Sequence, residues 1–536
     1  AYRVDRWWGG ETPAGFKGRF LGEAGSDAAA FRIPPKEMEE MLPQQHLALQ
    51  TAAAAIADSK LSEEGRDRVG VFLGVAFDLA ITQYDFRWSA EPGARDAVGP
   101  ALTANRVMGG LASVAASRVA REFRLGGPSF TVSAEENSGL KAVEAAVRAL
   151  PRGQVAAALA AAADACGDAR ALAAAQAAKP FTPSGVAGPF DAGADGASPG
   201  EGAACVVLKR LDDALKAGDR VYAVIKGMGS AGGAGLDEAA PSSPAVVEAL
   251  RRAYAEAHVD PSTVALLECH GSGDPKEDRS EASALVEVFG QAEAELPLAL
   301  SSAKTVIGHA GAAAGLAGLV KASLAVYQEL LPPGPALAAP VAPLAKAANR
   351  FHSPRKPQYW LRNRAEGPRR AGVTSLGLDG GVVHAVLEQL ERTSPDARVD
   401  DERRQPLGAR REALFAVEAG DAASLSEGLG ELAAWVSAQD PADGIEAVAR
   451  RWWMKTGRRH DAALACALVA RDWRELLALA RQAQDSIREN PERPIAGDRI
   501  HMTTRQALQG ETAFVFPGSG NHYVGMTTAF GVHWPE

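Results

Sequence analysis

One short stretch could place a reactive group at the start of a helix: residues 131–140 read TVSAEENSGL. It follows a turn and an aromatic, β-branched strand at 126–132, and it precedes an apolar segment of helical period at 140–150. A strand that breaks sharply into a helix leaves the turn residue where unpaired N–H groups and the helix dipole favour an anion. A thiolate nucleophile would suit this position, because such a terminus lowers the pKa of a cysteine. The stretch contains carboxylates and no cysteine.

This stretch resembles the nucleophile elbow of the β-ketoacyl synthases of fatty acid and polyketide assembly, whose motif reads roughly Val-Asp-x-Ala-Cys-x-Ser-Ser-Leu. Matching Val132 and Leu140 to its two ends places Glu136 at the cysteine position and Ser133 at the aspartate position. A carboxylate would be stabilised there as an anion, yet it is a poor acyl carrier because an acid anhydride would hydrolyse. We therefore expect that this domain does not catalyse condensation.

A second group of residues resembles the rest of the ketosynthase site: His270-Gly-Ser-Gly-Asp274, Lys304 and Gly-His309-Ala. In active members the two histidines help to decarboxylate the malonyl unit and hold the thioester oxygen, and the lysine supports one of them. Histidines at turns before helices are also common for plain hydrogen bonding. Relic, structural and decarboxylating roles therefore stay open for His270, Lys304 and His309. Asp274 replaces a threonine, which counts against tight binding of a phosphopantetheine arm.

Residues 377–384 stand where ketosynthases carry Gly-Phe-Gly-Gly-Thr-Asn-x-His. Leu378 replaces the gatekeeping phenylalanine, and Asp379 and Val382 replace a glycine and an asparagine near the oxyanion region. Changes at several points of one pocket suggest that condensation has been lost altogether.

Other positions bear on the acyl tunnel and on a partner subunit. Phe77 and Leu79 stand at the turn that borders the tunnel in ketosynthases, where they would narrow or end it; Phe77 could equally be an ordinary core residue. The resemblance also implies that the strand containing Phe130 and Val132 lies at a two-fold or pseudo-two-fold interface.

The resemblance covers about residues 15–390, and it implies a thiolase-like five-layer αβαβα fold for a domain over residues 1–390. Further segments that carry it lie at 31–38, 42–46, 105–110, 189–196 and 200–203. The apolar runs at 69–74, 155–163 and 204–209 predict buried strands that would position the elbow.

Beyond residue 390 the sequence predicts a small α/β domain over residues 391–508, with a strand at 414–417 and helices at 422–437 and 473–487. It resembles the linker between ketosynthase-type and acyltransferase domains. Residues 513–521 and 524–526 resemble the opening strand and turn of malonyl-type acyltransferases, so residues 509–536 would be the truncated start of such a domain. The resemblance begins after the glycine-rich first strand of ketosynthases, so we expect a piece of a larger polypeptide.

Composition limits the setting in which the protein works. The 536 residues carry a net charge of −9 without a basic tract, which argues against nucleic acid and anionic membranes as partners. The longest apolar run, 155–163, is too short to span a bilayer, and the polar start is no signal peptide. Cys166, Cys205, Cys269 and Cys466 lack paired metal spacing, which indicates buried thiols in a reducing cytoplasm and no metal site.

Together these patterns predict a chain-length factor, a catalytically silent ketosynthase homologue that pairs with an active ketosynthase domain as a heterodimer and shapes the acyl tunnel. The layout resembles the multidomain polyunsaturated fatty acid synthases of bacteria. The implied partners are that ketosynthase domain in the same polypeptide, an adjoining acyltransferase, and an acyl carrier protein that presents acyl chains on phosphopantetheine; no cofactor would be bound. Two alternatives are a decarboxylating loading domain acting on malonyl carrier protein and a homodimeric scaffold that docks carrier domains.

Overall fold

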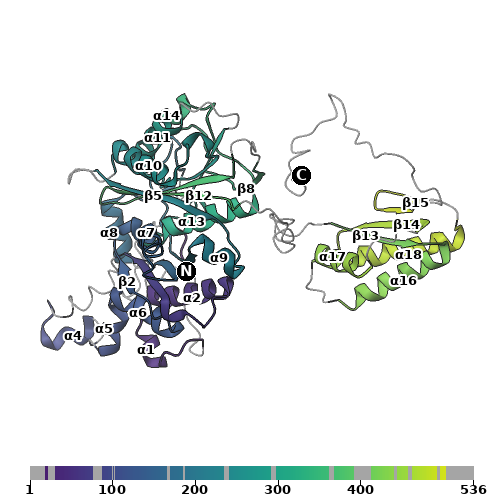
Figure 1. Cartoon of the computed structure of the whole chain (residues 1–536), viewed down its shortest axis with the longest axis horizontal. Helices are drawn as coiled ribbons and strands as arrows, with labels where there is room; N and C mark the ends of the chain where they lie inside the picture. Colours follow the sequence, from purple (N-terminus) through teal and green to yellow (C-terminus); the bar gives the residue numbers. More distant parts are fainter. Residues whose placement is uncertain are drawn as a thin grey trace. The chain divides into compact units, whose positions relative to one another are not determined.

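The structure, a computed structural model, describes residues 18–502 except 22–29, 77–86, 88, 99–100, 102, 166–168, 185–187, 234–240, 291–296, 361–366, 391–411, 440–443, 457–461 and 492–494. The chain divides into two compact units, Ala1–Ser394 and Pro395–Glu536. The elements of each unit are labelled in Figure 1. The acyltransferase-like residues 513–526 lie outside the described part of the chain.

The first sheet of the larger unit has the order β2-β1-β3-β4. Its strands are β2 (Ser129–Val132), β1 (Val69–Val75), β3 (Ala157–Asp164) and β4 (Gly202–Lys209). The first three are parallel, and β4 runs antiparallel to β3. β1 and β3 are buried along their whole length, as expected for strands that are apolar on both faces.

The second sheet has the order β5-β12-β11-β6-β7-β9. Its strands are β5 (Val224–Gly232), β12 (Gly381–Glu388), β11 (Arg370–Leu376), β6 (Leu266–Glu268), β7 (Leu298–Ser301) and β9 (Phe351–His352). β12 is antiparallel to both of its neighbours, whereas β11, β6, β7 and β9 are parallel to one another.

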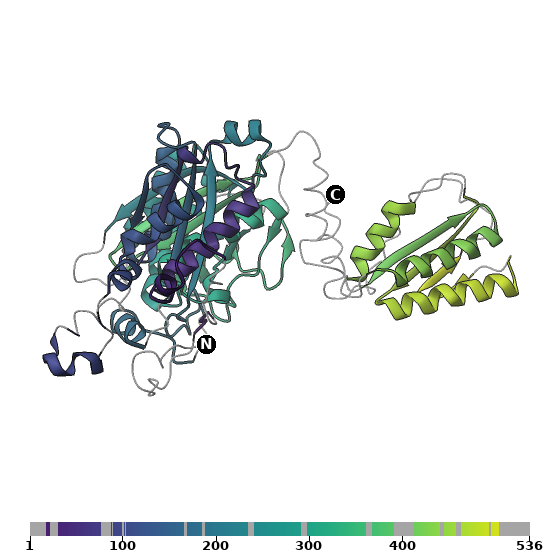
Figure 2. The same cartoon turned by 90° about the horizontal axis from the view of Figure 1, so that it is seen from below.

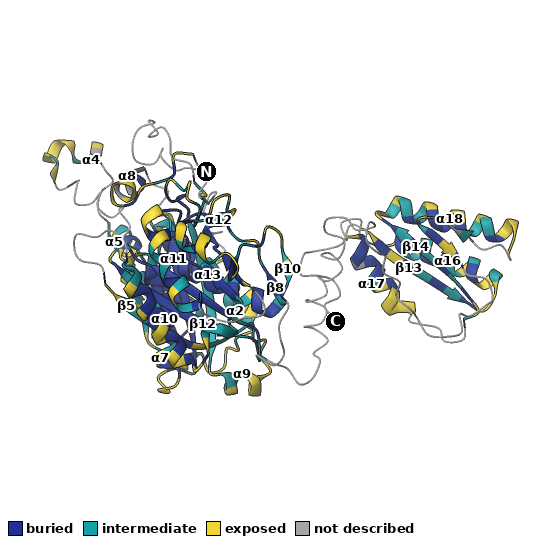
Figure 3. Ribbon diagram, turned by 90° about the horizontal axis from the view of Figure 1, so that it is seen from above, coloured by how far each residue is buried: buried dark blue, intermediate teal, exposed yellow. Residues whose placement is uncertain are grey.

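Helices fill the space between the two sheets and cover their outer faces. α7 (Ser138–Ala149) and α13 (Gly311–Gln328) pack between the sheets in one apolar core. α2 (Pro43–Ser59) and α6 (Ala112–Phe123) cover the first sheet, and α10 (Ser243–Ala257) and α11 (Pro275–Phe289) cover the second. The buried strands and central helix in Figure 3 follow this layering. The predicted five-layer αβαβα arrangement is confirmed.

Shorter elements connect these layers. They are α1 (Pro35–Glu39), η2 (Arg66–Arg68), η4 (Pro92–Ala94), α4 (Arg95–Val98), α5 (Ala104–Gly110), η5 (Glu135–Asn137), α8 (Ala169–Ala178), α9 (Leu211–Ala217), η6 (Pro261–Thr263), α12 (Lys304–Ile307), β8 (Leu330–Leu331), α14 (Ala342–Lys346) and β10 (Gln358–Tyr359).

The smaller unit is an antiparallel sheet with the order β13-β14-β16-β15, built from β13 (Ala413–Ala419), β14 (Leu464–Ala470), β16 (Ile500–Met502) and β15 (Ile495–Ala496). Its helices are α16 (Ala422–Ser437), α17 (Ile445–Thr456) and α18 (Trp473–Glu489), and α16 and α18 pack side by side (Figure 2). Asp421 and Asp472 cap α16 and α18 by accepting N–H bonds from Ser424 and Glu475. A small α/β unit thus follows the larger one.

In the part of the chain that the structure describes, no helix is both long and apolar enough to cross a membrane.

Candidate active site

The predicted elbow is a sharp turn between β2 and α7. β2 ends at Val132, α7 begins at Ser138, and Glu136 lies in the turn just before the helix. Glu135 has a φ of 47°, a left-handed conformation that costs energy for a residue with a side chain. The hydroxyl of Ser138 accepts the N–H of Ala134 at 2.9 Å and fixes the turn.

The carboxylate of Glu136 is only 14% exposed. Its Oε2 accepts the N–H of Leu378 at 2.5 Å, from the turn between β11 and β12. Its Oε1 lies 3.0 Å from Nζ of Lys179 and 3.9 Å from Nε2 of His309. Glu136 is therefore held as one partner of a buried ion pair.

Lys179, which no sequence pattern singled out, links the elbow to the other half of the domain. It follows α8, and its buried Nζ also lies 2.7 Å from Oε1 of Glu277, in the first turn of α11. Burial alone would lower the pKa of Lys179, but the charges of Glu136 and Glu277 outweigh burial and raise it. Lys179 therefore remains a cation between two carboxylates.

Glu277 continues the network toward the first histidine. Its carboxylate is 1% exposed, and Oε2 accepts the hydroxyl of Ser272 at 2.5 Å and lies 3.3 Å from Nε2 of His270. Nδ1 of His270 accepts the N–H of Leu376 at 3.1 Å, which assigns the proton of the neutral ring to Nε2. Lys179 and Glu277 thus connect Glu136 to His270.

Lys304 is buried and contacts His270, the pair for which the family resemblance implies a supporting lysine. Its Nζ donates to the backbone oxygen of His270 at 2.7 Å and lies 3.4 Å from Nδ1 of the ring. Burial lowers the pKa of Lys304, and the charge of nearby Glu281 partly offsets that effect. Lys304 fixes the backbone at His270 from inside the protein.

The two imidazoles lie edge to face, with an interplanar angle of 69°. The ring centroids of His270 and His309 are 5.4 Å apart. Burial holds the pKa of each ring well below its usual range, and the cations Lys179 and Lys304 lower it further. Nε2 of His309 has no hydrogen-bond partner among the described residues. A small oxygen acceptor placed there could be held by neutral N–H groups.

Further negative charge surrounds the elbow. Burial raises the pKa of Glu135, and the carboxylates of Glu136 and Asp379 raise it further, so these three acids lie within electrostatic reach of one another. Asp379 accepts the N–H of Gly381 at 2.9 Å in the turn that carries Leu378. An incoming carboxylate would therefore meet repulsion.

Asp274 has a local structural role. Its side chain accepts the N–H groups of Lys276 and Glu277 at 2.9 and 3.1 Å, which makes it the N-cap of α11. It therefore orients the helix that supplies Glu277.

The described cysteines do not supply a nucleophile at the elbow. Cys205, Cys269 and Cys466 are free thiols. Cys269 precedes His270, but its Sγ donates to the backbone oxygen of Leu267 at 3.6 Å, and burial raises its pKa well above the ordinary value. Such a thiol is a poor nucleophile. Cys166 lies outside the described residues, as do the tunnel candidates Phe77 and Leu79.

The remaining predicted positions lie on β2 and in the turn between β11 and β12. Phe130 is 43% exposed on β2, where its ring makes an edge-to-face contact with Phe72 at 5.0 Å, and Val132 is half-buried. Leu378 is also half-buried, and its N–H rather than its side chain contacts Glu136. Among the described residues, no cluster of His, Cys, Asp and Glu could hold a metal ion.

We expect His270 and His309 to stay neutral when the pH falls from 8 to 5.5, because burial and two cations lower both pKa values. In ¹⁵N-histidine-labelled protein, the ring signals assigned with the variants His270→Gln and His309→Gln should not move over this range. The urea-unfolded protein is the reference, since its histidines titrate near a pH of about 6.5. Imidazolium shifts in the folded protein at pH 6 would contradict the assigned electrostatics.

Family models match most of the larger unit. Residues 3–214 match the β-ketoacyl synthase N-terminal domain, and residues 222–337 match the β-ketoacyl synthase C-terminal domain. The chain is also similar to solved ketosynthases. It covers 86% of an oxazolomycin ketosynthase domain from Streptomyces albus, with 96% of this chain aligned, a TM-score of 0.64 and 26% identity. It covers 76% of the ketosynthase from module 6 of the Bacillus subtilis bacillaene synthase, with 87% of this chain aligned, a TM-score of 0.60 and 26% identity.

Curated relatives are multidomain synthases. The phthioceranic/hydroxyphthioceranic acid synthase of Mycobacterium tuberculosis is 32% identical over 525 residues, which is 97% of this chain and 23% of that protein. The pikromycin polyketide synthase component PikAIII of Streptomyces venezuelae is 31% identical over 515 residues, which is 95% of this chain and 31% of that protein. The chain thus spans about a quarter to a third of the length of these relatives. With both ketosynthase domain models matched and the thiolase-like fold in place, the chain belongs to the β-ketoacyl synthase family and carries a ketosynthase-type domain of polyketide synthases.

Proposed function

We propose that this domain is a catalytically silent ketosynthase homologue, a chain-length factor, that pairs with an active β-ketoacyl synthase domain in polyunsaturated fatty acid or polyketide biosynthesis. The observation that carries the proposal is the buried ion pair of Glu136 with Lys179 at the elbow. Acyl transfer needs a thiolate that can attack a thioester at this position. The carboxylate found there is already paired with a cation of the protein, which it shares with Glu277.

The surrounding donors support the same conclusion. The N–H of Leu378 is bonded to Glu136, so it is not available to a developing oxyanion. Lys179 is one cation between the two carboxylates of Glu136 and Glu277, so it has no excess charge with which to attract a substrate acid. The carboxylate of Glu136 and the N–H of Leu378 are therefore satisfied by each other and by Lys179, whereas Nε2 of His309 has no partner among the described residues.

The outer edge of the first sheet supports a partner subunit. Among the described strands, β2 has β1 as its only neighbour, so its other edge carries unpaired backbone groups. Large apolar side chains are exposed on β2 and on α5 and the start of α6; these are Phe130, Val107, Met108 and Leu111. An open strand edge next to apolar side chains is suited to a protein interface. We assign this edge to an active ketosynthase domain of the same polypeptide, with Phe130, Val132 and Leu378 facing the shared tunnel.

In this assembly the substrates are acyl chains on the phosphopantetheine of an acyl carrier protein, and an adjoining acyltransferase domain loads the carrier. The silent domain would limit the length of the tunnel rather than form a bond. We assign Phe77 and Leu79 to the tunnel wall.

The protein incubated with malonyl carrier protein should leave the malonyl group intact. Glu136, Glu135 and Asp379 repel the malonyl carboxylate, so mass spectrometry should find acetyl carrier protein forming no faster than without the protein. The variant Glu136→Gln, which removes one charge without changing size, is the matched comparison. Decarboxylation by the wild-type protein well above the protein-free rate would rule out the silent assignment.

That outcome would favour the alternative, a decarboxylating loading domain. Its support is the pair of neutral imidazoles, because the Nε2 atoms of His270 and His309 could donate to a thioester oxygen. The negative charge around the elbow weighs against it.

A cysteine-bearing ketosynthase domain should co-purify with this protein as a one-to-one complex in native mass spectrometry. Phe130→Asp should weaken that complex at least about ten-fold, because it buries a charge at the interface. Leu215→Asp, at a residue 50% exposed on α9, is the matched control and should have no effect. A stable self-dimer that ignores the ketosynthase domain would instead support a scaffold that docks carrier domains.

A further inference from the structure

The turn between β11 and β12, residues 377–380, is fastened to the elbow by the side chains of two neighbouring residues. On one arm of the turn, Oε2 of Glu136 accepts the N–H of Leu378. On the other arm, Nδ2 of Asn137 donates to the backbone oxygen of Gly381 at 3.0 Å. The elbow therefore holds both arms of the turn.

The end of β11 depends on such contacts because its neighbour β6 stops earlier. β11 pairs with β6 only over residues 371–373. Beyond that point the N–H of Leu376 donates to Nδ1 of His270 at 3.1 Å, and the hydroxyl of Ser375 donates to the backbone oxygen of Glu136 at 3.3 Å. Contacts with the elbow and with His270 therefore fix the part of β11 that β6 does not reach.

Asn137 is fitted closely to the backbone of this turn. The residue is 1% exposed. The oxygen of Gly381 that it contacts also accepts the N–H of Gly377 at 2.8 Å, the bond that closes the turn. A Cβ atom on Gly377 would lie 2.5 Å from Nδ2 of Asn137, so the amide group packs directly against the turn. Asn137 therefore holds the turn at the bond that closes it.

The elbow is itself anchored and can act as a fixed support. The hydroxyl of Ser138, which is fully buried, lies 3.2 Å from the backbone oxygen of Val75 at the end of β1. A Cβ atom on Gly139 would lie 2.8 Å from the backbone oxygen of Ala312 in α13, so the start of α7 approaches that helix closely. The elbow thus ties the turn between β11 and β12 to the first sheet and to the central helices.

We propose that Asn137 is a positioning residue for chain-length specificity, because it holds the turn 377–380, and therefore Leu378, in one place. This inference rests on the proposed function, which assigns Leu378 to the shared tunnel. One buried methylene group changes binding only about four-fold, so a tunnel can select one acyl length only if the residues that line it stay in place. Glu136 acts together with Asn137, since its carboxylate holds the N–H of Leu378 itself.

The first test is hydrogen exchange of the turn in the free protein, measured by mass spectrometry. Asn137→Ala should speed exchange of the amides of residues 376–381 at least about five-fold, the effect of losing one hydrogen bond. The amides of β1 and β3 should exchange as in the wild type. Asn137→Ser, whose hydroxyl is too short to reach Gly381, should give the same result and replaces Asn137→Ala if that variant folds poorly.

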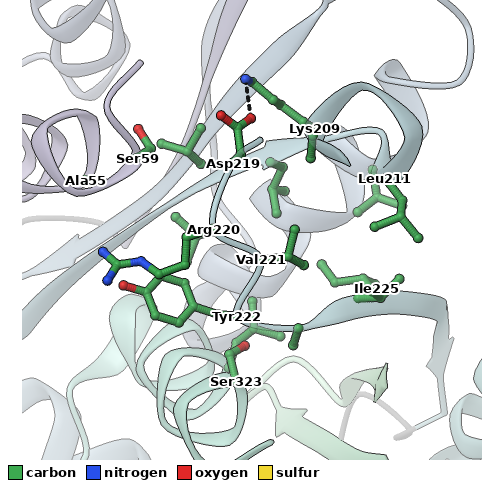
Figure 4. Close-up of a pocket in the computed structure, with 18 of the residues that line it drawn as sticks. Ala55, Ser59, Lys209, Leu211, Asp219, Arg220, Val221, Tyr222, Ile225 and Ser323 are labelled. Carbon is green, nitrogen blue, oxygen red and sulfur yellow. Dashed lines mark hydrogen bonds and ion pairs between the residues drawn. The ribbon is translucent and has the colours of Figure 1, made fainter. Parts of the chain in front are cut away.

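Asp219→Ala is the matched control, because aspartate has the size and shape of asparagine. Asp219 forms an ion pair with Lys209 at 2.5 Å beside a pocket of about 550 Å³, drawn in Figure 4. Lys209 pairs with Ala157 at the start of β3, whereas the elbow follows the far end of the parallel strand β2. The control therefore lies at the opposite end of the first sheet, and it should leave exchange of the turn unchanged.

The second test measures the products of the protein paired with an active ketosynthase domain. Supplied with an acyl thioester and malonyl carrier protein, the wild-type pair should give one main acyl length by mass spectrometry. With Asn137→Ala the share of that length should fall at least about two-fold in favour of neighbouring lengths, while total turnover stays within about two-fold. A role in folding alone would lower turnover and leave the distribution of lengths unchanged.

Unchanged exchange of the turn in both Asn137 variants would overturn the proposal. So would a turn that exchanges faster in a pair whose distribution of acyl lengths is unchanged. A wild-type protein that forms no complex with the ketosynthase domain would instead defeat the proposed function. In that case the exchange result alone decides whether Asn137 positions the turn.

Discussion

Replacing Lys179 with methionine should lower the free energy of unfolding by about 3–5 kcal/mol, because it leaves two buried carboxylates without their cation. The side chains of Glu136 and Glu277 are 14% and 1% exposed, so water can replace little of the lost interaction. Urea denaturation at pH 7 of the wild type and of Lys179→Met measures the difference.

The controls separate charge from packing. Arg251→Met breaks an ion pair whose side chains are 63% and 53% exposed, and should cost no more than about 1 kcal/mol. The triple variant Lys179→Met, Glu136→Gln, Glu277→Gln should regain most of the loss. An ionised carboxylate is costly to bury without a counter-ion, whereas a protonated carboxyl is much less so, so the loss of Lys179 costs more where carboxyl groups are ionised. The deficit of Lys179→Met should therefore be larger at pH 7 than at pH 5, and a deficit independent of pH would point to packing instead.

The parts of the fold that depend on continuous patterns could be predicted from the sequence. Uniformly apolar runs such as those of β1 and β3 have few alternatives to a buried strand. The helix expected at 422–437 coincides with α16, because Asp421 caps its start and apolar residues recur at helical spacing. The elbow was predicted for the same reason, since a strand and a helix meet there within a few residues.

The buried ion network could not be predicted, because its members are far apart in the chain. Lys179 is 43 residues from Glu136, at the end of an alanine-rich segment where a lysine is usually solvated. Glu277 lies in the first turn of α11, where an acid is explained by the helix dipole alone. The one available signal was indirect: a carboxylate buried at Glu136 requires a counter-ion, but nothing in the sequence says which of 57 lysines and arginines supplies it.

Asp274 is a residue that the sequence did single out, but for which a structural role was not predicted. The sequence suggested an effect on the phosphopantetheine arm, and the structure adds a local reason for the residue, since its carboxylate caps α11. A residue at a motif position can thus serve the helix that follows it.

Restoring a thiol with Glu136→Cys should produce a reactive cysteine but no condensing enzyme. The thiolate would lie just before α7 and next to the ammonium group of Lys179, both of which lower the pKa of a thiol. Alkylation by iodoacetamide at pH 7 should be at least about ten-fold faster than for Glu135→Cys, the neighbouring and more exposed position. The native cysteines Cys205, Cys269 and Cys466 should stay unlabelled, because burial raises their pKa values.

Condensation should still be absent in Glu136→Cys, because the nucleophile is only one of the altered parts of the pocket. Glu135 and Asp379 would continue to repel the malonyl carboxylate, and Glu277 would keep Lys179 bound. The measurement is formation of a β-ketoacyl product from an acyl thioester and malonyl carrier protein, with an active ketosynthase domain as the positive control. If Glu136→Cys formed the product at a rate near that of the control, the absence of a thiol at this one position would account for the lack of condensation. The negative charge around the elbow would then have no role in it.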